Sequence, residues 1–226
     1  KIYHNFKNFF PRFLSGNINK KKSISSLTHT YYDTSFQKDK SAFWKNPNKS
    51  IFYDSTIAFP IFKDDKFLTE LAIYPNFPRK NITFDLDIID TSGKIISKIN
   101  SFLKINKKLD SPVYININDL LNKDKHNLDK DKKYFGRMII NGNGSVPARL
   151  KFALNIQNTK KYQIPSNVCF NAHVPNNSVL KKPGTFKWGP ILNKFNSIIT
   201  ISNISNLKEK NKNAKITLKF WNEIDE

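Results

Sequence analysis

The amino-acid sequence predicts an all-β protein built as an antiparallel β-sandwich. Three observations support this fold class: short segments in which apolar and polar residues alternate, turn residues between those segments, and few stretches with helical spacing. Many short strands separated by proline, glycine and asparagine are typical of stacked antiparallel sheets. With 226 residues the chain can form one large sandwich or two tandem ones.

The N-terminal part, residues 1–26, is predicted to be an arm outside the sandwich. Residues 1–14 place aromatic and aliphatic side chains at roughly helical spacing, but Pro11 argues against one unbroken helix. Two interpretations stay open: the arm packs on the body of the protein, or it lies in a membrane interface, where aromatic and basic side chains are favoured. Residues 15–26 are expected to form a loop.

A strand is predicted at residues 27–35, and it carries chemically suggestive side chains. In an extended chain His29, Tyr31 and Asp33 share one face, while Tyr32 lies on the other. The histidine and the aspartate are then about 13 Å apart, too far to bind one metal ion by themselves. A site here would need a partner from another strand, and a histidine and tyrosines at a sheet edge are the simpler interpretation.

A polar, lysine-rich loop follows at residues 36–50 and contains Trp44. A tryptophan in a loop can stack on a sugar ring or a base, or it can cap a core. Residues 51–62 are expected to form a pair of strands, with Pro60 near the end.

Residues 69–94 give the clearest strand pattern in the chain. A first strand around Leu71 and Ile73 ends at Pro75, because proline cannot donate a ladder hydrogen bond. In a second strand, the run FDLDI at 84–88 places three apolar side chains on one face and two aspartates on the other, so this strand is expected to be half-buried. The run DTSG at 90–93 then supplies a hairpin turn.

The middle of the chain continues the strand pattern. Residues 95–109 predict a strand and a basic loop, residues 112–117 another strand, and residues 118–121 a capped helical turn. The charged loop at 122–133 lacks the glycine and the terminal glutamate of an EF-hand, so calcium binding there is not expected.

A hairpin is predicted within residues 134–156. Strand-like runs at 134–140 and 149–156 flank the turn sequence NGNG, which favours direct pairing of the two strands. The turn is not a phosphate-binding loop, because no Gly-Lys-Ser/Thr follows it.

A further strand is predicted at residues 168–175, and Cys169, Asn171 and His173 share one of its faces. The cysteine and the histidine are then about 13 Å apart, so a nucleophilic Cys-His pair within this strand is not expected. The metal or catalytic candidate is instead His173 opposite His29 on a neighbouring strand, with Asp33 or Asn171 orienting them.

A basic, aromatic, turn-rich loop at residues 181–190 contains Lys187 and Trp188. Such a loop suits an anionic glycan, a nucleic-acid strand or a lipid surface, and the simpler interpretation is that the tryptophan closes one end of the sandwich. Residues 199–203 and 216–222 repeat the patterns of 71–76 and 84–90, which predicts an internal duplication. The alternative is that any two amphipathic strands look alike.

The formal net charge of +20 has a compositional explanation. Of the 38 basic residues only four are arginines, and lysine, asparagine, isoleucine and phenylalanine are abundant together, as in AT-rich coding sequences. Because arginine suits bidentate contacts with bases and phosphates, sequence-specific nucleic-acid recognition is not expected. Non-specific attraction to nucleic acid or anionic lipid still follows from the charge.

The single cysteine and the two ends of the sequence bear on the compartment of the protein and on its covalent structure. Cys169 is the only cysteine, so no disulfide can form within the chain. No run has the length of a membrane-spanning helix and no signal-peptide pattern opens the chain. Since the first residue is lysine and the last strand pattern stops early, we expect that sequence is missing at both ends.

The pattern of strands and turns in residues 69–94 resembles, in its general style, the immunoglobulin-like or fibronectin-like sandwich modules of bacterial surface and secreted proteins. The expected organisation is an arm at residues 1–26, a β-sandwich domain at 27–160, and a second sandwich or the remaining strands of the first at 161–226.

This resemblance implies a non-catalytic binding or structural module of the cell envelope or exterior. Its expected partner is a glycan or another protein, and no cofactor is expected. The predicted contact residues are loop aromatics and a lysine: Tyr31, Tyr32, Trp44, Lys187 and Trp188. Two alternatives stay open, a metal-dependent or hydrolytic enzyme using His29, Asp33 and His173, and a non-specific polyanion binder.

Overall fold

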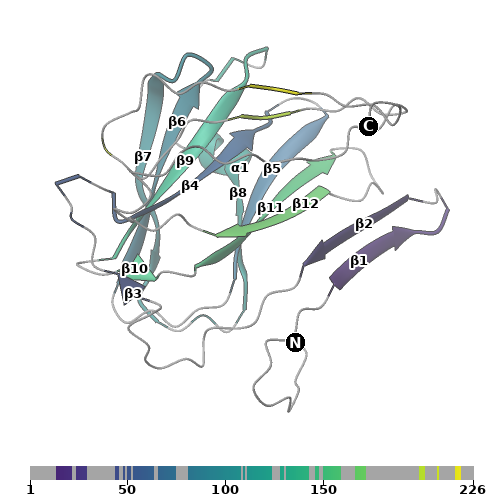
Figure 1. Ribbon diagram of the computed structural model, residues 1–226, viewed down its shortest axis with the longest axis horizontal. Coiled ribbons are helices and arrows are strands. Elements are labelled where there is room, and N and C mark those ends of the chain that lie inside the picture. Colours follow the sequence, from purple (N-terminus) through teal and green to yellow (C-terminus); the bar gives the residue numbers. More distant parts are fainter. Residues whose placement is uncertain are drawn as a thin grey trace.

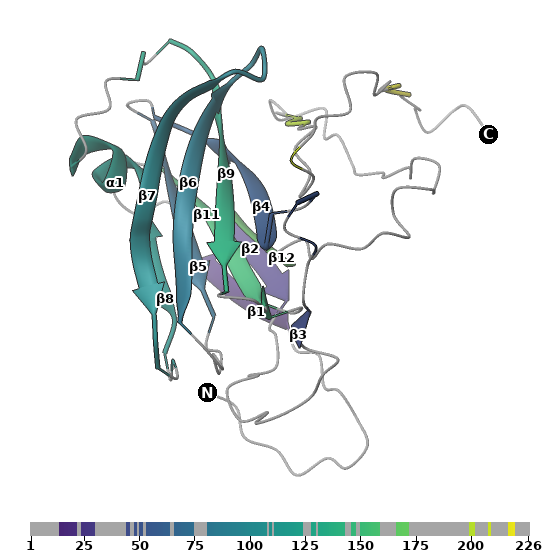
Figure 2. The same ribbon diagram turned by 90° about the vertical axis from the view of Figure 1, so that its left-hand side faces the viewer.

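Two four-stranded antiparallel sheets form the body of the protein (Figures 1 and 2). The computed structural model describes residues 14–21, 24–29, 44–45, 48, 50–51, 53–63, 66–74, 81–107, 109, 111–123, 128–129, 131–142, 146–147, 150–158, 166–171, 199–201, 208 and 217–219. Strands make up most of this part of the chain, and α1 is the helix within it. The all-β prediction is confirmed.

The first sheet, called the β4 sheet, has the order β4-β9-β6-β7. Its strands are β4 (Ser55–Ile61), β9 (Tyr134–Asn141), β6 (Ile82–Asp90) and β7 (Ile95–Ile105). The second, called the β5 sheet, has the order β12-β11-β5-β8. Its strands are β12 (Ser166–Asn171), β11 (Lys151–Asn158), β5 (Phe67–Ile73) and β8 (Val113–Asn116).

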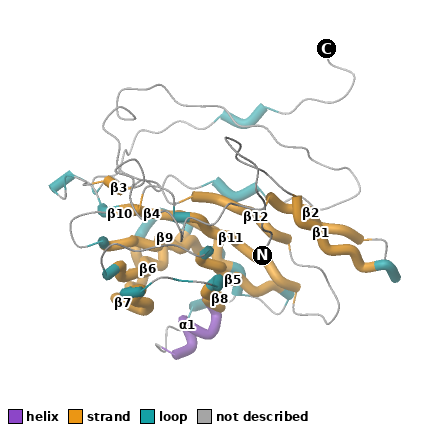
Figure 3. The backbone as a smooth tube through the Cα atoms, turned by 90° about the horizontal axis from the view of Figure 1, so that it is seen from below, coloured by secondary structure: helices purple, strands orange, loops and turns teal. Residues whose placement is uncertain are grey.

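Two small sheets and one helix complete the described part of the fold. The strands β1 (Leu14–Asn19) and β2 (Ile24–His29) form a hairpin, and β3 (Trp44–Lys45) pairs with β10 (Val146–Pro147). The helix α1 (Ile117–Lys123) follows β8 and packs against β5, next to the buried core (Figure 3).

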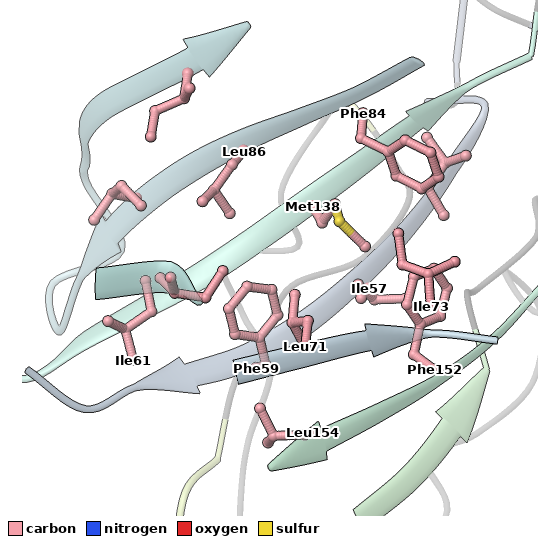
Figure 4. Close-up of a cluster of buried hydrophobic side chains, with 14 of the residues drawn as sticks. Ile57, Phe59, Ile61, Leu71, Ile73, Phe84, Leu86, Met138, Phe152 and Leu154 are labelled. Atoms are coloured by element: carbon pink, nitrogen blue, oxygen red, sulfur yellow. The ribbon is translucent and has the colours of Figure 1, made fainter. Parts of the chain in front are cut away.

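One hydrophobic core lies between the two large sheets (Figure 4). Phe59 of β4, Phe84 of β6 and Phe152 of β11 are among its largest fully buried side chains. Along β4, β6, β9 and β11, alternate residues point into this core, as the period of two requires. The sandwich is therefore held by apolar side chains from both sheets, including Leu71 and Met138.

The two strands and the turn predicted within residues 69–94 are present in the structure. β5 ends at Ile73, β6 buries Phe84, Leu86 and Ile88, and β7 begins directly after the turn at residues 91–94. Gly93 has a φ of 84° there, which an L side chain rarely adopts. The strands β6 and β7 form the predicted hairpin.

The Asp90 carboxylate fixes the β6–β7 turn. Its Oδ1 accepts hydrogen bonds from the Ser92 hydroxyl at 2.6 Å, the Ser92 N–H at 2.9 Å and the Lys94 N–H at 3.0 Å. The bonds from Ser92 and Lys94 favour the charged carboxylate and lower the pKa of Asp90 below its ordinary value of 3.8.

Stability is therefore expected to depend on pH through this turn. The pKa of Asp90 is lower in the folded than in the unfolded state, so the charged carboxylate stabilises the folded protein at pH values above its ordinary pKa of 3.8. This stabilisation is lost as the pH falls through the lowered pKa. The free energy of unfolding in urea, measured across the acid pH range, should show this loss in the wild type and not in the Asp90→Asn variant. Parallel pH profiles of the two proteins would contradict it.

The helix α1 begins one residue earlier than predicted because Asn116 caps it. The Asn116 Oδ1 accepts hydrogen bonds from the N–H groups of Asn118 at 2.9 Å and Asp119 at 3.3 Å. Such a cap satisfies N–H groups that have no partner within the helix. The predicted helical turn at 118–121 lies inside α1.

Asn116→Ala is expected to lower the free energy of unfolding by about 1 kcal/mol, because the helix loses this cap. Asn116→Asp keeps an oxygen acceptor and should lose much less. Chemical denaturation of the three proteins measures the difference, and an equal loss in both variants would show that the cap is not responsible.

Three local predictions are wrong. Where a loop was predicted at 15–26, Leu14–Asn19 and Ile24–His29 form the strands of a hairpin. The described residues within 51–62 form one strand, β4, rather than a pair. The runs 134–140 and 149–156 do not pair, because β9 and β11 lie in opposite sheets. The Gly142 N–H instead donates a 2.9 Å hydrogen bond to the Asp54 carboxylate, which ties the end of β9 to the start of β4.

The predicted internal duplication is not found where the structure describes it. Residues 199–201 and 217–219 form no strand, and Ile199, Ile201 and Leu218 are exposed. The strand β12, which follows residue 160, is hydrogen-bonded to β11 within the β5 sheet. The domain boundaries themselves and the immunoglobulin-like or fibronectin-like style stay predictions.

Candidate binding surface

A buried ion pair lies on the outer face of the β4 sheet, away from the core. Asp87 of β6 and Arg137 of β9 are opposite each other in the ladder, and the Arg137 Nε donates a 3.0 Å hydrogen bond to the Asp87 carboxylate. Their side chains are only 6% and 5% exposed. The Arg137 guanidinium also lies 4.8 Å from the centre of the Tyr53 ring, at cation–π distance.

This pair corrects the expectation that β6 is only half-buried. The two aspartates do point away from the core, but Asp87 is buried because this face of the sheet is covered as well. Ile89 and Ile139, which point to the same side, are also buried. A period of two shows which residues share a face and does not show whether that face is open to solvent.

The neighbouring carboxylates are engaged in structural hydrogen bonds. Asp85 accepts from the Ser101 N–H at 2.7 Å and from the Asn141 amide at 2.6 Å, and Asp54 accepts from the Gly142 N–H. Within the described residues, no group of three or more histidines, cysteines, aspartates or glutamates could bind a metal ion. We therefore assign these carboxylates to holding strands together.

The predicted site residues are placed only in part. Trp44 begins β3, where it pairs with Pro147 of β10, and His29 ends β2, where it pairs with Leu14. The other predicted residues lie outside the part of the chain that the structure describes: Tyr31, Tyr32, Asp33, His173, Lys187 and Trp188.

The β1–β2 hairpin lies next to the β5 sheet. β2 lies beside β12, and Figure 1 shows both arrows pointing the same way. β2 ends at His29, and β12 ends at Asn171, two residues before His173 in the sequence. Within β12, the Cys169 sulfur lies 3.4 Å from the Tyr74 hydroxyl.

The β1–β2 hairpin carries an exposed apolar face that was not predicted from the sequence. In the register of this hairpin Leu14, Gly16 and Ile18 share a face with Leu27, which is paired with Gly16. The exposed fractions are 62% for Leu14, 73% for Ile18 and 64% for Leu27. We call these three side chains the hairpin face.

A sequence signal for this hairpin exists. Leu14-x-Gly16-x-Ile18 alternates like a strand, and Asn19 begins a turn in which its Oδ1 accepts a 3.2 Å hydrogen bond from the Lys21 N–H. The exposed Lys20 and Lys21 lie at this turn. Residues 1–32 contain six basic residues and no aspartate or glutamate. The part of the sequence that carries the hairpin face is therefore positively charged.

Comparison with protein-family models, with curated proteins and with solved structures finds no match. Within the described residues, no helix is both long and apolar enough to cross a membrane.

Proposed function

We propose that the protein is a non-catalytic binding module of the cell envelope or exterior that recognises a glycan through aromatic side chains at one end of its sandwich. The observation that supports this most directly is the position of Trp44. β3 and β10 form a two-residue ladder at one end of the sandwich, and Trp44 is a member of it (Figure 1). This ladder fixes the backbone that carries Trp44. Tryptophan is the kind of side chain that offers a broad apolar ring for stacking.

The rest of the proposed contact set comes from the sequence. In the sequence, Tyr31 and Tyr32 follow β2, and Lys187 and Trp188 belong to the basic, turn-rich run at 181–190 that comes after β12. Aromatic rings supply stacking area and the lysine supplies attraction to acidic sugars.

The test is binding of the full chain to a glycan array and to soluble polysaccharides. Trp44→Ala is expected to weaken binding about tenfold or more, since stacking on one aromatic ring contributes roughly 1–3 kcal/mol by analogy with bases. Trp188→Ala should have a similar effect. Tyr114→Ala is the matched control, because Tyr114 is 63% exposed but lies on β8 in the β5 sheet. No glycan bound, or equal loss in all three variants, would overturn the proposal.

The position of β2 beside β12 supports a second candidate function, a metal-dependent or hydrolytic enzyme. This placement favours a site containing His29 and His173, with Asp33 as a third ligand or an orienting group. Metal analysis of the purified protein tests it, since each zinc ligand must lie about 2 Å from the metal. A non-specific polyanion binder would instead show affinity that falls steeply as the salt concentration rises.

A further inference from the structure

We propose that the hairpin face docks on the surface of an anionic membrane. Its aliphatic side chains enter the boundary between headgroups and acyl chains, and the lysines of the hairpin turn lie against anionic headgroups. This inference concerns a different surface from the proposed glycan site, so either can fail without the other. It rests on the exposure of three aliphatic side chains, on the side of the hairpin that they share, and on the charge at the turn.

The aliphatic side chains of the hairpin face form one exposed group. In the described part of the chain, Ile18 and Leu27 are the two most exposed large hydrophobic side chains, and Leu14 is close to them in exposure. Because Leu27 is paired with Gly16, it is the diagonal neighbour of both Leu14 and Ile18 across the ladder, at roughly 7–8 Å. Single exposed apolar side chains are common, but a group on one surface is a mark of an interaction site.

The two sides of the hairpin differ in polarity. The described side chains on the side opposite the hairpin face are polar: Asn17, Asn19 and Ser26. The hairpin is therefore amphipathic, with aliphatic side chains directed one way and amide or hydroxyl groups directed the other. An amphipathic element of this kind suits a boundary between water and an apolar phase.

The turn supplies positive charge beside this apolar surface. Lys20 and Lys21 are exposed and come directly after Asn19, the last residue of β1. Residues 1–32 contain no aspartate or glutamate, so the local sequence provides no carboxylate to offset these lysines. Anionic bilayers attract basic residues that lie close to the surface. The hairpin thus combines the two interactions that hold a protein at an anionic membrane.

An anionic bilayer accommodates both parts of this surface, whereas two other partners do not. A nucleic acid would use the lysines, but its bases stack on aromatic rings, so the aliphatic side chains would stay in water. A second copy of the chain would cover the aliphatic side chains, but each copy carries a formal net charge of +20, and the two would repel each other.

A protein partner is less favoured because the surface is small. A specific protein interface contains roughly 20–30 residues on each side, far more than the hairpin face offers. A bilayer is fluid and needs no matching shape, so a few apolar side chains next to lysines are enough for reversible binding. Figures 1 and 3 show the hairpin at the margin of the described strands, with β1 outermost, where it can approach a flat surface.

Vesicle sedimentation with the full chain tests the proposal. The wild type should bind phosphatidylcholine–phosphatidylserine vesicles, and about tenfold or more weakly to phosphatidylcholine alone. Salt should weaken the binding without abolishing it, because the apolar contribution is not screened. No binding to the phosphatidylserine vesicles would overturn the proposal.

Ile18→Gln tests the apolar contribution without changing the charge. It is expected to weaken vesicle binding about tenfold, because the apolar area that enters the bilayer is lost. Ile96→Gln is the matched control, since Ile96 is 40% exposed on β7, away from the hairpin. Both positions are exposed, so melting curves should match the wild type. Equal vesicle affinity of the two variants would contradict docking through the hairpin face.

The charge contribution is tested with two pairs of lysines. The double variant Lys20→Gln with Lys21→Gln should weaken binding to phosphatidylserine vesicles about tenfold or more. Lys98→Gln with Lys104→Gln removes the same charge from exposed positions on β7 and should have little effect. Equal losses in the two double variants would assign the binding to total charge and would overturn the proposal.

A spin label at position 18 reports insertion directly. Cys169 is the only cysteine, so Ile18→Cys in a Cys169→Ser background gives one labelling site. On phosphatidylserine vesicles this label should become more accessible to oxygen and less accessible to a water-soluble nickel chelate. A label introduced by Ile96→Cys in the same background should not change. A label at position 18 that stays in water on bound vesicles would rule out insertion.

Two further results would identify another occupant and overturn the proposal. The first is binding to double-stranded DNA or polyglutamate that is tighter than binding to the vesicles and is lost in Ile18→Gln. The second is self-association of the wild type that Ile18→Gln abolishes, which would show that a second copy covers the hairpin face.

Discussion

Arg137→Met is expected to lower the free energy of unfolding by about 3–5 kcal/mol, because it leaves the Asp87 carboxylate buried without its partner. Both side chains of this ion pair are almost fully enclosed, and the Tyr53 ring lies over the guanidinium. Methionine fills a similar volume, so the loss reports the charge rather than a cavity. Urea denaturation followed by circular dichroism gives the difference, provided that the slope of the transition is unchanged.

Two controls separate the buried charge from other effects. The double variant Asp87→Leu with Arg137→Met removes both charges and should recover most of the loss, since an apolar replacement of a whole buried pair is often neutral. Lys132→Met removes the cation of an exposed pair with Asp129, whose side chains are 69% and 46% exposed, and should change stability by less than about 1 kcal/mol. Equal effects of the two methionine substitutions would show that Arg137 is not buried in solution.

The parts of the fold that could be predicted are those in which one strand face meets one core. Phe84, Leu86 and Ile88 are spaced two apart, and all three are fully buried. The turn at Asp90 was predictable for a similar reason, because its hydrogen bonds connect residues at most four apart in the sequence. Local patterns identify local structure.

The pairing of distant strands could not be predicted in this way. The turn sequence after β9 predicted a hairpin, but the chain crosses to the opposite sheet and β11 pairs with β5. The partner of Asp87 lies fifty positions away, and no spacing rule connects it to Arg137. The exposed β1–β2 hairpin was missed because its apolar residues are few and do not form a core. Of the proposed glycan contacts, only the backbone at Trp44 is placed by the fold.

Gly136→Ala is expected to lower the free energy of unfolding by about 1–3 kcal/mol, because the new methyl group has no room. Gly136 of β9 is opposite Phe59 of β4, and a Cβ at this position would lie 2.4 Å from the Phe59 Cζ and 2.6 Å from its Cε2. The phenyl ring is itself fully buried, so it cannot turn into solvent. The ring or the strand must therefore move, and both belong to a close-packed core.

The physical cause is tested by shortening the ring side chain. Phe59→Leu costs stability alone, but in combination with Gly136→Ala the loss should be smaller than the sum of the single losses. Gly16→Ala is the matched control: its Cβ would contact the exposed Leu27, which can move, so we expect a change below about 0.5 kcal/mol. If the two glycine variants were equally stable, the Phe59 ring would not lie against the β9 backbone. The β4–β9 register, in which both the core and the buried Arg137 take part, would then be wrong.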